Sequence, residues 1–321
     1  MENAILRHIE PPTVSFLIPV LNEDGTITEL AERILSVTAG SSVEIIFIDD
    51  GSTDNSWKII SSLSMENSAI KGLRFRRNFG KARALSAGAE IAKAPIVITM
   101  DADLQDDPNE IPLFLEKLSE GYDIVSGWKK NRLDPLGKTI PSKIFNYFTR
   151  KISGVDLKDF NCGFKAAHTE VYRNIPLYGE LHRYVPVLAH ALGYKYVELP
   201  VLHHPRTVGK SKYGLERYVR GFIDLITVIA ITRYGQRPAH LFGGIGVLVG
   251  VVSTAILFYL LIIKLTAGAA IGDRPLLIFG VLLAILSAQL ITLGALAEVV
   301  INRTSGPDSK VLISAAVGVE K

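Results

Sequence analysis

The chain has 321 residues, a formal net charge of +3 and an isoelectric point near 8.8. This length suits one large domain with further elements or two small domains, and so weak a basicity gives no support for nucleic-acid binding. The single cysteine, Cys162, excludes an intrachain disulfide, and the mean hydropathy of +0.27 is high for a soluble enzyme. The opening MENAILRHIEPP lacks the apolar core of a signal peptide, and we interpret it as a loosely held lead-in.

The first 210 residues alternate apolar, β-branched runs with helix-like runs. Strands are predicted at TVSFLIPV, VEIIFIDD, GLRFRR, PIVITMD and YDIVSG, and helices at TITELAERILSV, STDNSWKIISSL and GKARALSAGAEIA. This alternation predicts a Rossmann-like α/β domain over residues 1–210, with a mainly parallel sheet covered on both faces. Ligands of such sheets bind beyond the carboxyl ends of the strands.

Two of these strands end in pairs of acids. Asp49 and Asp50 end the second strand, and Asp101 and Asp103 end the fourth. Both pairs are therefore expected at the ligand-binding edge of the sheet. The two carboxylates of an extended Asp-Ala-Asp lie on the same side of the chain, which suits a divalent cation that carries a diphosphate.

Other polar residues in these two motifs are expected to play local structural roles. Asp106 and Asp107 precede a proline and the predicted helix PNEIPLFLEKL, so we expect them to cap its N-terminus. Gly51, Ser52 and Asp54 are typical of turns and helix caps.

Two long stretches carry no charge. Leu241–Ile263 and Pro275–Ala297 each exceed the ~20 residues that a helix needs to cross a bilayer. The linker between them is short, so we predict a transmembrane hairpin over residues 238–302 and a tail over 303–321. A pair of buried core helices is the alternative. Cations flank the hairpin outside the linker, and the positive-inside rule then places both termini and the catalytic domain in the cytoplasm.

Residues 211–237 form a separate juxtamembrane region. From Tyr213 to Thr232, apolar and charged residues separate onto two faces with a helical period. We predict an amphipathic helix that lies along the membrane surface. Packing against the soluble domain is the alternative, and both can hold in part.

The order of the motifs is specific. FLIPVLNE, IDDGSTD, RNFGKARALSAG and DADLQDDP follow one another in an order that resembles family 2 glycosyltransferases of the GT-A fold. The continuation SGWKKNR, DFNCGFK, HRYVP and RTVGKSKYG, followed by two spans, is similar to the polyprenyl-phosphate glycosyltransferases. That group includes dolichol-phosphate mannose synthase and bacterial GtrB-type glucosyltransferases. The resemblance covers nearly the whole chain.

The resemblance implies a nucleotide-binding role for the first two motifs. Pro19, Leu21 and Glu23 match the loop that holds the base and ribose of the nucleotide. Asp50 matches the acid that binds the base, with Asp49 as the alternative. Pure turn chemistry is the other interpretation of Asp50.

The DXD motif and the DFNCGFK motif imply the catalytic centre. Asp101, Asp103 and Gln105 match the residues that bind Mg²⁺ or Mn²⁺ and the diphosphate, and Asp103 is counted as catalytic. Asp159 matches the acid proposed as catalytic base, with Asp156 close by. Because a lipid phosphate is already anionic at neutral pH, Asp159 equally suits positioning of the sugar or of a cation, and both roles stay open.

Four cations match phosphate-side positions of the family. Arg183 lies near the acceptor, and Arg206 and Lys212 match residues that hold the lipid phosphate or the diphosphate. Lys129 matches a further donor-side position. General attraction to anionic lipid, worth ~1 kcal/mol for each cation, is the alternative for Arg206 and Lys212.

The resemblance therefore predicts an inverting transferase in the bacterial inner membrane that moves a hexose from a nucleotide sugar, with UDP-glucose as leading donor. The acceptor is a polyprenyl phosphate such as undecaprenyl phosphate, and the product serves cell-envelope or glycan modification. Mannose, N-acetylglucosamine and an aminoarabinose derivative are the alternative sugars. A non-catalytic membrane scaffold is the rival from another class. The resemblance also implies a homotetramer.

Overall fold

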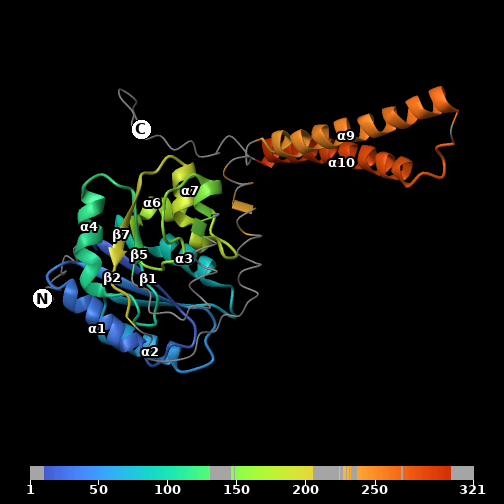
Figure 1. Cartoon of the computed structure of the whole chain (residues 1–321). Helices are drawn as coiled ribbons and strands as arrows, with labels where there is room; N and C mark the ends of the chain where they lie inside the picture. Colours follow the sequence, from blue (N-terminus) through green and yellow to red (C-terminus); the bar gives the residue numbers. More distant parts are fainter. Residues whose placement is uncertain are drawn as a thin grey trace, which may run out of the picture. The chain divides into compact units, whose positions relative to one another are not determined.

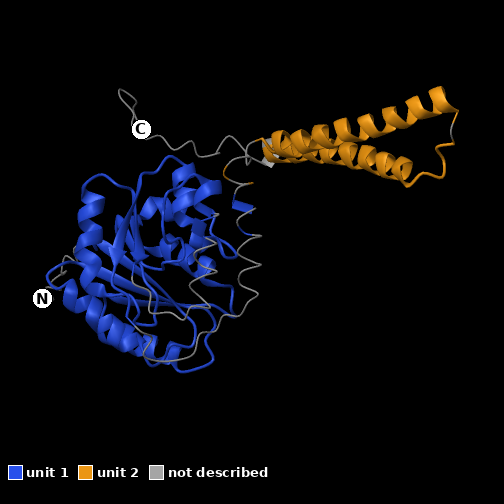
Figure 2. Cartoon of the chain, viewed as in Figure 1, with its two compact units in different colours: residues 1–228 blue, residues 229–321 orange. Residues whose placement is uncertain are grey.

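The computed structural model describes residues 11–130, 146, 147, 149–204, 224, 227, 228, 230, 232, 237–268 and 270–304. The chain divides into two compact units, residues 1–228 and 229–321 (Figure 2). The domain boundary predicted at residue 210 lies outside the described residues. So does most of the predicted amphipathic helix, whose described members, 224, 227, 228, 230 and 232, are helical.

The first unit is built on one seven-stranded sheet of order β3-β2-β1-β4-β6-β5-β7 (Figure 1). Its strands are β1 (Val14–Val20), β2 (Val43–Asp49), β3 (Ile70–Arg74), β4 (Ile96–Thr99), β5 (Ile124–Lys129), β6 (Lys165–His168) and β7 (Tyr196–Val201). Only β6 runs against its neighbours, β4 and β5. The expectation of a mainly parallel sheet is confirmed, and five of the strands match predicted ones. The sequence patterns had not indicated β6 and β7.

Helices cover both faces of this sheet. On one face, α1 (Ile27–Val37) contacts α2 (Ser56–Glu66) and η1 (Pro108–Glu110). The short helix η1 leads directly into α4 (Ile111–Ser119) on the same face. On the other, α3 (Lys81–Ile91) contacts α6 (Thr169–Asn174) and η2 (Leu181–Tyr184), which continues into α7 (Val185–Ala191). The central strands are buried on both faces, which explains their continuous apolar runs.

The reversed direction of β6 has a consequence for the site. The strands that share one direction all end at the same edge of the sheet, whereas β6 begins there. Lys165, the first residue of β6, pairs with Thr99, the last residue of β4. Lys165 is thereby placed at the edge where β4 ends, and the charge of Asp101, two residues beyond β4, acts on it.

The second unit is a hairpin of two helices, α9 (Pro238–Ala267) and α10 (Pro275–Thr304). Both are long and apolar enough to cross a membrane, and only 17% and 11% of their most apolar windows are buried. So little burial argues against the alternative of core helices. The Ser253 hydroxyl donates to the carbonyl of Gly280 (2.8 Å), and the Ser287 hydroxyl donates to that of Gly246 (2.7 Å). Such small-residue contacts are typical of helices that pack in lipid.

Candidate functional site

The loops that follow β1 and β2 are bound to each other. The Ser52 hydroxyl accepts the amide of Asn22 (2.9 Å), and the Ser56 hydroxyl accepts the amide of Glu23 (3.0 Å). Asn22 has a positive φ of 52°, which turns the chain sharply after β1. These bonds hold the loop after β1 against the loop after β2. The three residues predicted to contact the nucleotide are Pro19, at the end of β1, and Leu21 and Glu23, in that loop.

The two acids after β2 bind backbone amides. The Asp50 carboxylate accepts the amides of Phe79 (2.6 Å) and Gly80 (2.9 Å), which ties the start of α3 to the end of β2. Burial raises the pKa of Asp50, the two amides oppose that shift, and the charge of Asp49 adds to it. Asp49 is fully buried and pairs with Arg74 at 3.2 Å. Recognition of the base by Asp50 stays a prediction.

Asp101, the first acid of the DXD motif, is paired with a lysine that the sequence analysis did not assign. Its carboxylate forms an ion pair with Lys81, at the start of α3, and remains about one-third exposed. Burial opposes ionisation, but the ammonium groups of Lys81 and Lys129 outweigh it and hold the pKa of Asp101 well below its ordinary value. A Cβ at Gly163 would lie 2.6 Å from Oδ2 of Asp101, so a side chain there would displace that carboxylate.

Asp103 and Gln105 lie in the turn that follows. Asp103 is 7% exposed and accepts the amide of Gln105 at 3.2 Å, while Leu104 between them has a φ of 60°. The Gln105 side chain donates to the carbonyl of His204 (3.3 Å), which fastens the turn to the segment after β7. Two of the three predicted metal ligands, Asp103 and Gln105, thus belong to a tightly bonded turn at the sheet edge.

This donor set fits a divalent cation that shares its ligands with a substrate. Within the part of the chain that the structure describes, no three His, Cys, Asp or Glu side chains are grouped to hold a metal ion. Asp101 and Asp103 instead offer two carboxylates, and Gln105, whose backbone amide donates to Asp103, follows in the same turn. Mg²⁺ is usually bound through one or two carboxylates together with phosphate oxygens and water. The residues therefore suit Mg²⁺ or Mn²⁺ held jointly with a diphosphate.

Asp106 is not the helix cap that we expected. Its carboxylate is fully buried and pairs with Nζ of Lys129 at 2.9 Å. Burial disfavours the Lys129 ammonium, but Asp106 and the more distant Asp101 raise its pKa above the ordinary value. The ion pair joins the DXD turn to the end of β5. For Asp107 the capping prediction is confirmed, because its carboxylate accepts the amide of Asn109 at 3.0 Å.

The loop before β6 distinguishes the two candidates for the catalytic acid. Asp159 is buried and accepts the amide of Asn161 at 3.0 Å, whereas the Asp156 side chain is 84% exposed. Glu198 of β7 accepts the amides of Lys158 (2.7 Å) and Asp159 (3.0 Å), which fixes the loop. Burial raises the pKa of Glu198, and the charge of Asp159 adds to that shift. This placement favours Asp159 over Asp156.

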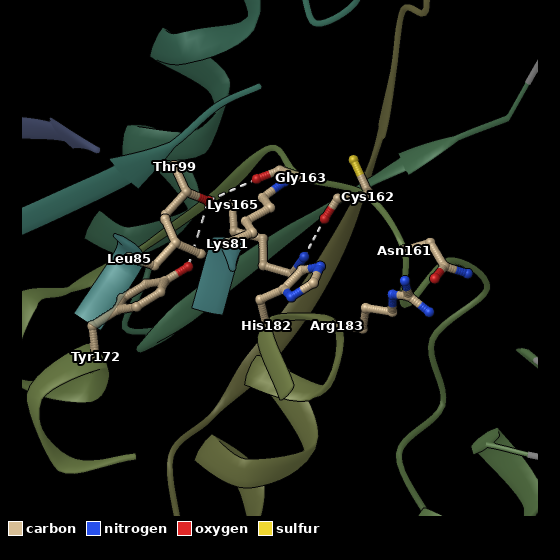
Figure 3. Close-up of a pocket in the computed structure, with 10 residues that line it drawn as sticks. All are labelled: Lys81, Leu85, Thr99, Asn161, Cys162, Gly163, Lys165, Tyr172, His182 and Arg183. Carbon is tan, nitrogen blue, oxygen red and sulfur yellow. Dashed lines mark hydrogen bonds between the residues drawn. The ribbon is translucent and has the colours of Figure 1, made fainter. Parts of the chain in front are cut away.

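A small pocket between α3, β6 and η2 gathers basic side chains (Figure 3). Lys165 is 3% exposed, and its ammonium donates to the carbonyl of Cys162. Arg183 is buried and pairs with Glu180 at 2.5 Å. Burial lowers the pKa of Lys165, and burial together with the surrounding cations lowers that of His182 well below its ordinary value.

The sequence analysis assigned Arg183 but not the other basic residues of this pocket. Lys81 directly follows a glycine at the start of a predicted helix, a signal that could have found it. Lys165 begins a strand that reads KAAH, which lacks the β-branched apolar run that revealed the equally short β4. Arg206 and Lys212, predicted to hold the lipid phosphate, lie outside the described residues.

A comparison with protein-family models decides the family. Residues 15–177, about half of the chain, match the model described as Glycosyl transferase family 2. The chain belongs to glycosyltransferase family 2. The resemblance expected from the motif order is thereby confirmed, and the sheet that carries the site is that of the GT-A fold.

Similar family 2 glycosyltransferases narrow the group further. The dodecaprenyl-phosphate galacturonate synthase of Rhizobium johnstonii is 37% identical over 297 residues, which cover 89% of this chain and 87% of that protein. The undecaprenyl-phosphate 4-deoxy-4-formamido-L-arabinose transferase of Shewanella sediminis is 35% identical over 291 residues, or 89% and 86% of the two chains. The chain thus falls among the polyprenyl-phosphate sugar transferases.

Solved structures agree with the fold. Glucosyl-3-phosphoglycerate synthase of Mycobacterium tuberculosis, crystallised with Mn²⁺, UDP and phosphoglyceric acid, superposes with a TM-score of 0.53 at 18% identity. The match covers 69% of this chain and 78% of that one. At this identity the likeness supports the fold of the present chain and says nothing of its substrates.

We expect Asp106→Ala to lower the free energy of unfolding by about 3–5 kcal/mol, because it leaves the buried Lys129 ammonium without its carboxylate. The double variant Asp106→Leu/Lys129→Met should regain most of that loss, since an apolar pair of similar volume replaces a buried ion pair well. Urea unfolding followed by circular dichroism measures both. Asp156→Ala, which removes an exposed pair with Arg150, is the control and should stay close to wild type. Equal losses of unfolding free energy in Asp106→Ala and Asp156→Ala would contradict a special stabilising role of the buried Asp106–Lys129 pair.

Proposed function

We propose that the chain is a membrane-anchored, inverting transferase that moves a sugar from a UDP-sugar to a polyprenyl phosphate such as undecaprenyl phosphate. One observation carries this proposal: a single edge of the sheet brings together the DXD acids, the buried Asp159 and a set of buried cations. A scaffold needs none of these groups, and the chain belongs to an enzyme family. The scaffold alternative is therefore set aside.

The donor diphosphate lies at Asp101, Asp103 and Gln105, which hold Mg²⁺ or Mn²⁺. When bound, the cation supplies positive charge that stabilises the departing nucleoside diphosphate. Lys81 and Lys129 surround Asp101 with further positive charge. The joined loops after β1 and β2 hold the base and ribose.

The acceptor needs orientation more than activation. Its phosphate is ionised at neutral pH, so an oxygen can attack the anomeric carbon from the face opposite the nucleotide without losing a proton. Asp159, fixed through Glu198 and buried beside the pocket, orients the reacting groups in this proposal. A role as general base is the alternative.

The hairpin of α9 and α10 keeps the catalytic domain at the cytoplasmic face of the bacterial inner membrane, where the lipid phosphate lies. Arg206 and Lys212 bind that phosphate at the interface. The homotetramer implied by the resemblance stays a prediction.

The sugar is open among several candidates. Glucose is the sugar expected from the sequence, with mannose and N-acetylglucosamine as its alternatives. The two relatives are named for galacturonate and for 4-deoxy-4-formamido-L-arabinose. All of these belong in the donor panel.

The reaction is tested by incubating the full chain in vesicles with undecaprenyl phosphate and labelled UDP-sugars, followed by lipid extraction. We expect a lipid-linked sugar that disappears with chelator, and a loss of at least about a hundredfold in Asp103→Ala, because several kcal/mol of charge stabilisation are removed. Asp156→Ala, an exposed acid of the same domain, is the control and should keep its activity. Undiminished transfer in chelator, or in Asp103→Ala, would refute the metal role.

Arg206→Ala and Lys212→Ala are expected to stay in the membrane, because the hairpin alone anchors the chain. Each should lose about ten- to a hundredfold in transfer, the cost of one charge-assisted bond to phosphate. Arg206→Lys should restore activity only in part, since it lacks the two-pronged geometry of arginine. The measurement is transfer rate against lipid-phosphate concentration in neutral and in anionic vesicles, with Lys264→Ala as control. A defect confined to anionic vesicles would show general lipid attraction instead.

A further inference from the structure

The basic pocket lies where the sugar of the donor must be. It is lined by Lys81, which pairs with Asp101, and by Gly163, which packs against the same carboxylate. Asn161 also lines it, and its backbone amide donates to Asp159. The sugar is bonded to the diphosphate on one side and meets the acceptor on the other. If the diphosphate binds at Asp101, as the proposed function has it, the pocket faces the transferred sugar.

The charges of this pocket are not those that a neutral sugar needs. Lys81 and Arg183 each have a carboxylate partner, Asp101 and Glu180. The ammonium of Lys165 does not: it donates to the Cys162 carbonyl, and no carboxylate among the residues that the structure describes lies within ion-pair distance. A buried cation without a direct carboxylate partner is costly even though the charges of Asp159 and Asp101 reach it, and an anion beside it would offset that cost.

The neighbours of Lys165 suit the same anion. Nδ1 of His182 is buried and has no hydrogen-bond partner within the described ranges, so it can donate to an oxygen. The Arg183 guanidinium lines the same pocket and, while it pairs with Glu180, adds positive charge that suits a carboxylate (Figure 3). A hydroxymethyl group would bring no charge to Lys165, and an amino sugar would bring a second cation.

We propose that Lys165, Arg183 and His182 bind the carboxylate of a hexuronic acid, so that the sugar transferred is a hexuronic acid rather than a neutral hexose. Lys165 and Arg183 then determine donor specificity. The proposal rests on the proposed function, because it assigns the sugar end of that same site.

Matched donor pairs test the proposal with the unaltered chain. UDP-glucuronate is compared with UDP-glucose, and UDP-galacturonate with UDP-galactose, in vesicles that contain undecaprenyl phosphate. We expect the uronic member of at least one pair to be transferred tenfold or more faster than its neutral partner. Equal or faster transfer of the neutral member in both pairs would overturn the inference and leave the proposed function standing. No transfer from any UDP-sugar of the panel would overturn both.

Substitution of Lys165 tests the residue itself. Lys165→Met should reduce the ratio of uronic to neutral transfer about ten- to a hundredfold, because one charge-assisted bond to the uronic carboxylate is lost. Lys165→Arg should keep the preference, and Lys117→Met, on the surface of α4, is the control.

Equal loss on both donors would show a merely structural role. A raised KM for lipid phosphate with unaltered donor preference would show that the pocket binds the acceptor, and either result overturns the proposal. If melting curves show that Lys165→Met is unfolded, the donor pairs decide alone.

Discussion

Pairing of acids with bases at one edge of the sheet is the interaction on which the rest of the structure depends. The fully buried Asp106 pairs with Lys129, and the half-buried Asp101 pairs with Lys81. Buried charges are tolerated only when they are paired and hydrogen-bonded. The Lys129–Asp106 and Lys81–Asp101 pairs therefore draw together the DXD turn, the end of β5 and helix α3. The ion pairs that assemble this edge of the sheet also offset the cost of removing its acids from water.

Much of this arrangement could be predicted because its causes are local. Continuous β-branched runs predict the buried strands β1, β2 and β4, and a strand followed by Asp-Ala-Asp places two acids at a sheet edge. The two uncharged stretches indicate the hairpin in the same way. Motif order then identified the family, since it fixes which residues follow which strand.

The remaining features depend on partners that are distant in sequence. Asp106 looks like a helix cap beside a proline, and only the position of Lys129, at the end of another strand, makes it an ion-pair partner. β6 reads KAAH and has no β-branched run to mark it as a strand, and its reversed direction brings Lys165 to the site. The fixing of Asp159 by Glu198 likewise comes from tertiary packing, whereas the pair of Arg183 with Glu180 spans only three residues of the chain.

The central claim is that Asp101 and Asp103 await a divalent cation and a diphosphate, with Lys81 as the present counter-charge of Asp101. The most direct measurement is the structure of the full chain with Mn²⁺ and UDP, in which anomalous scattering locates the manganese. We expect the ion between these two carboxylates and the diphosphate, with the Lys81 ammonium turned from Asp101 toward phosphate oxygens. Manganese bound elsewhere, with the pair of Lys81 and Asp101 intact, would contradict this claim.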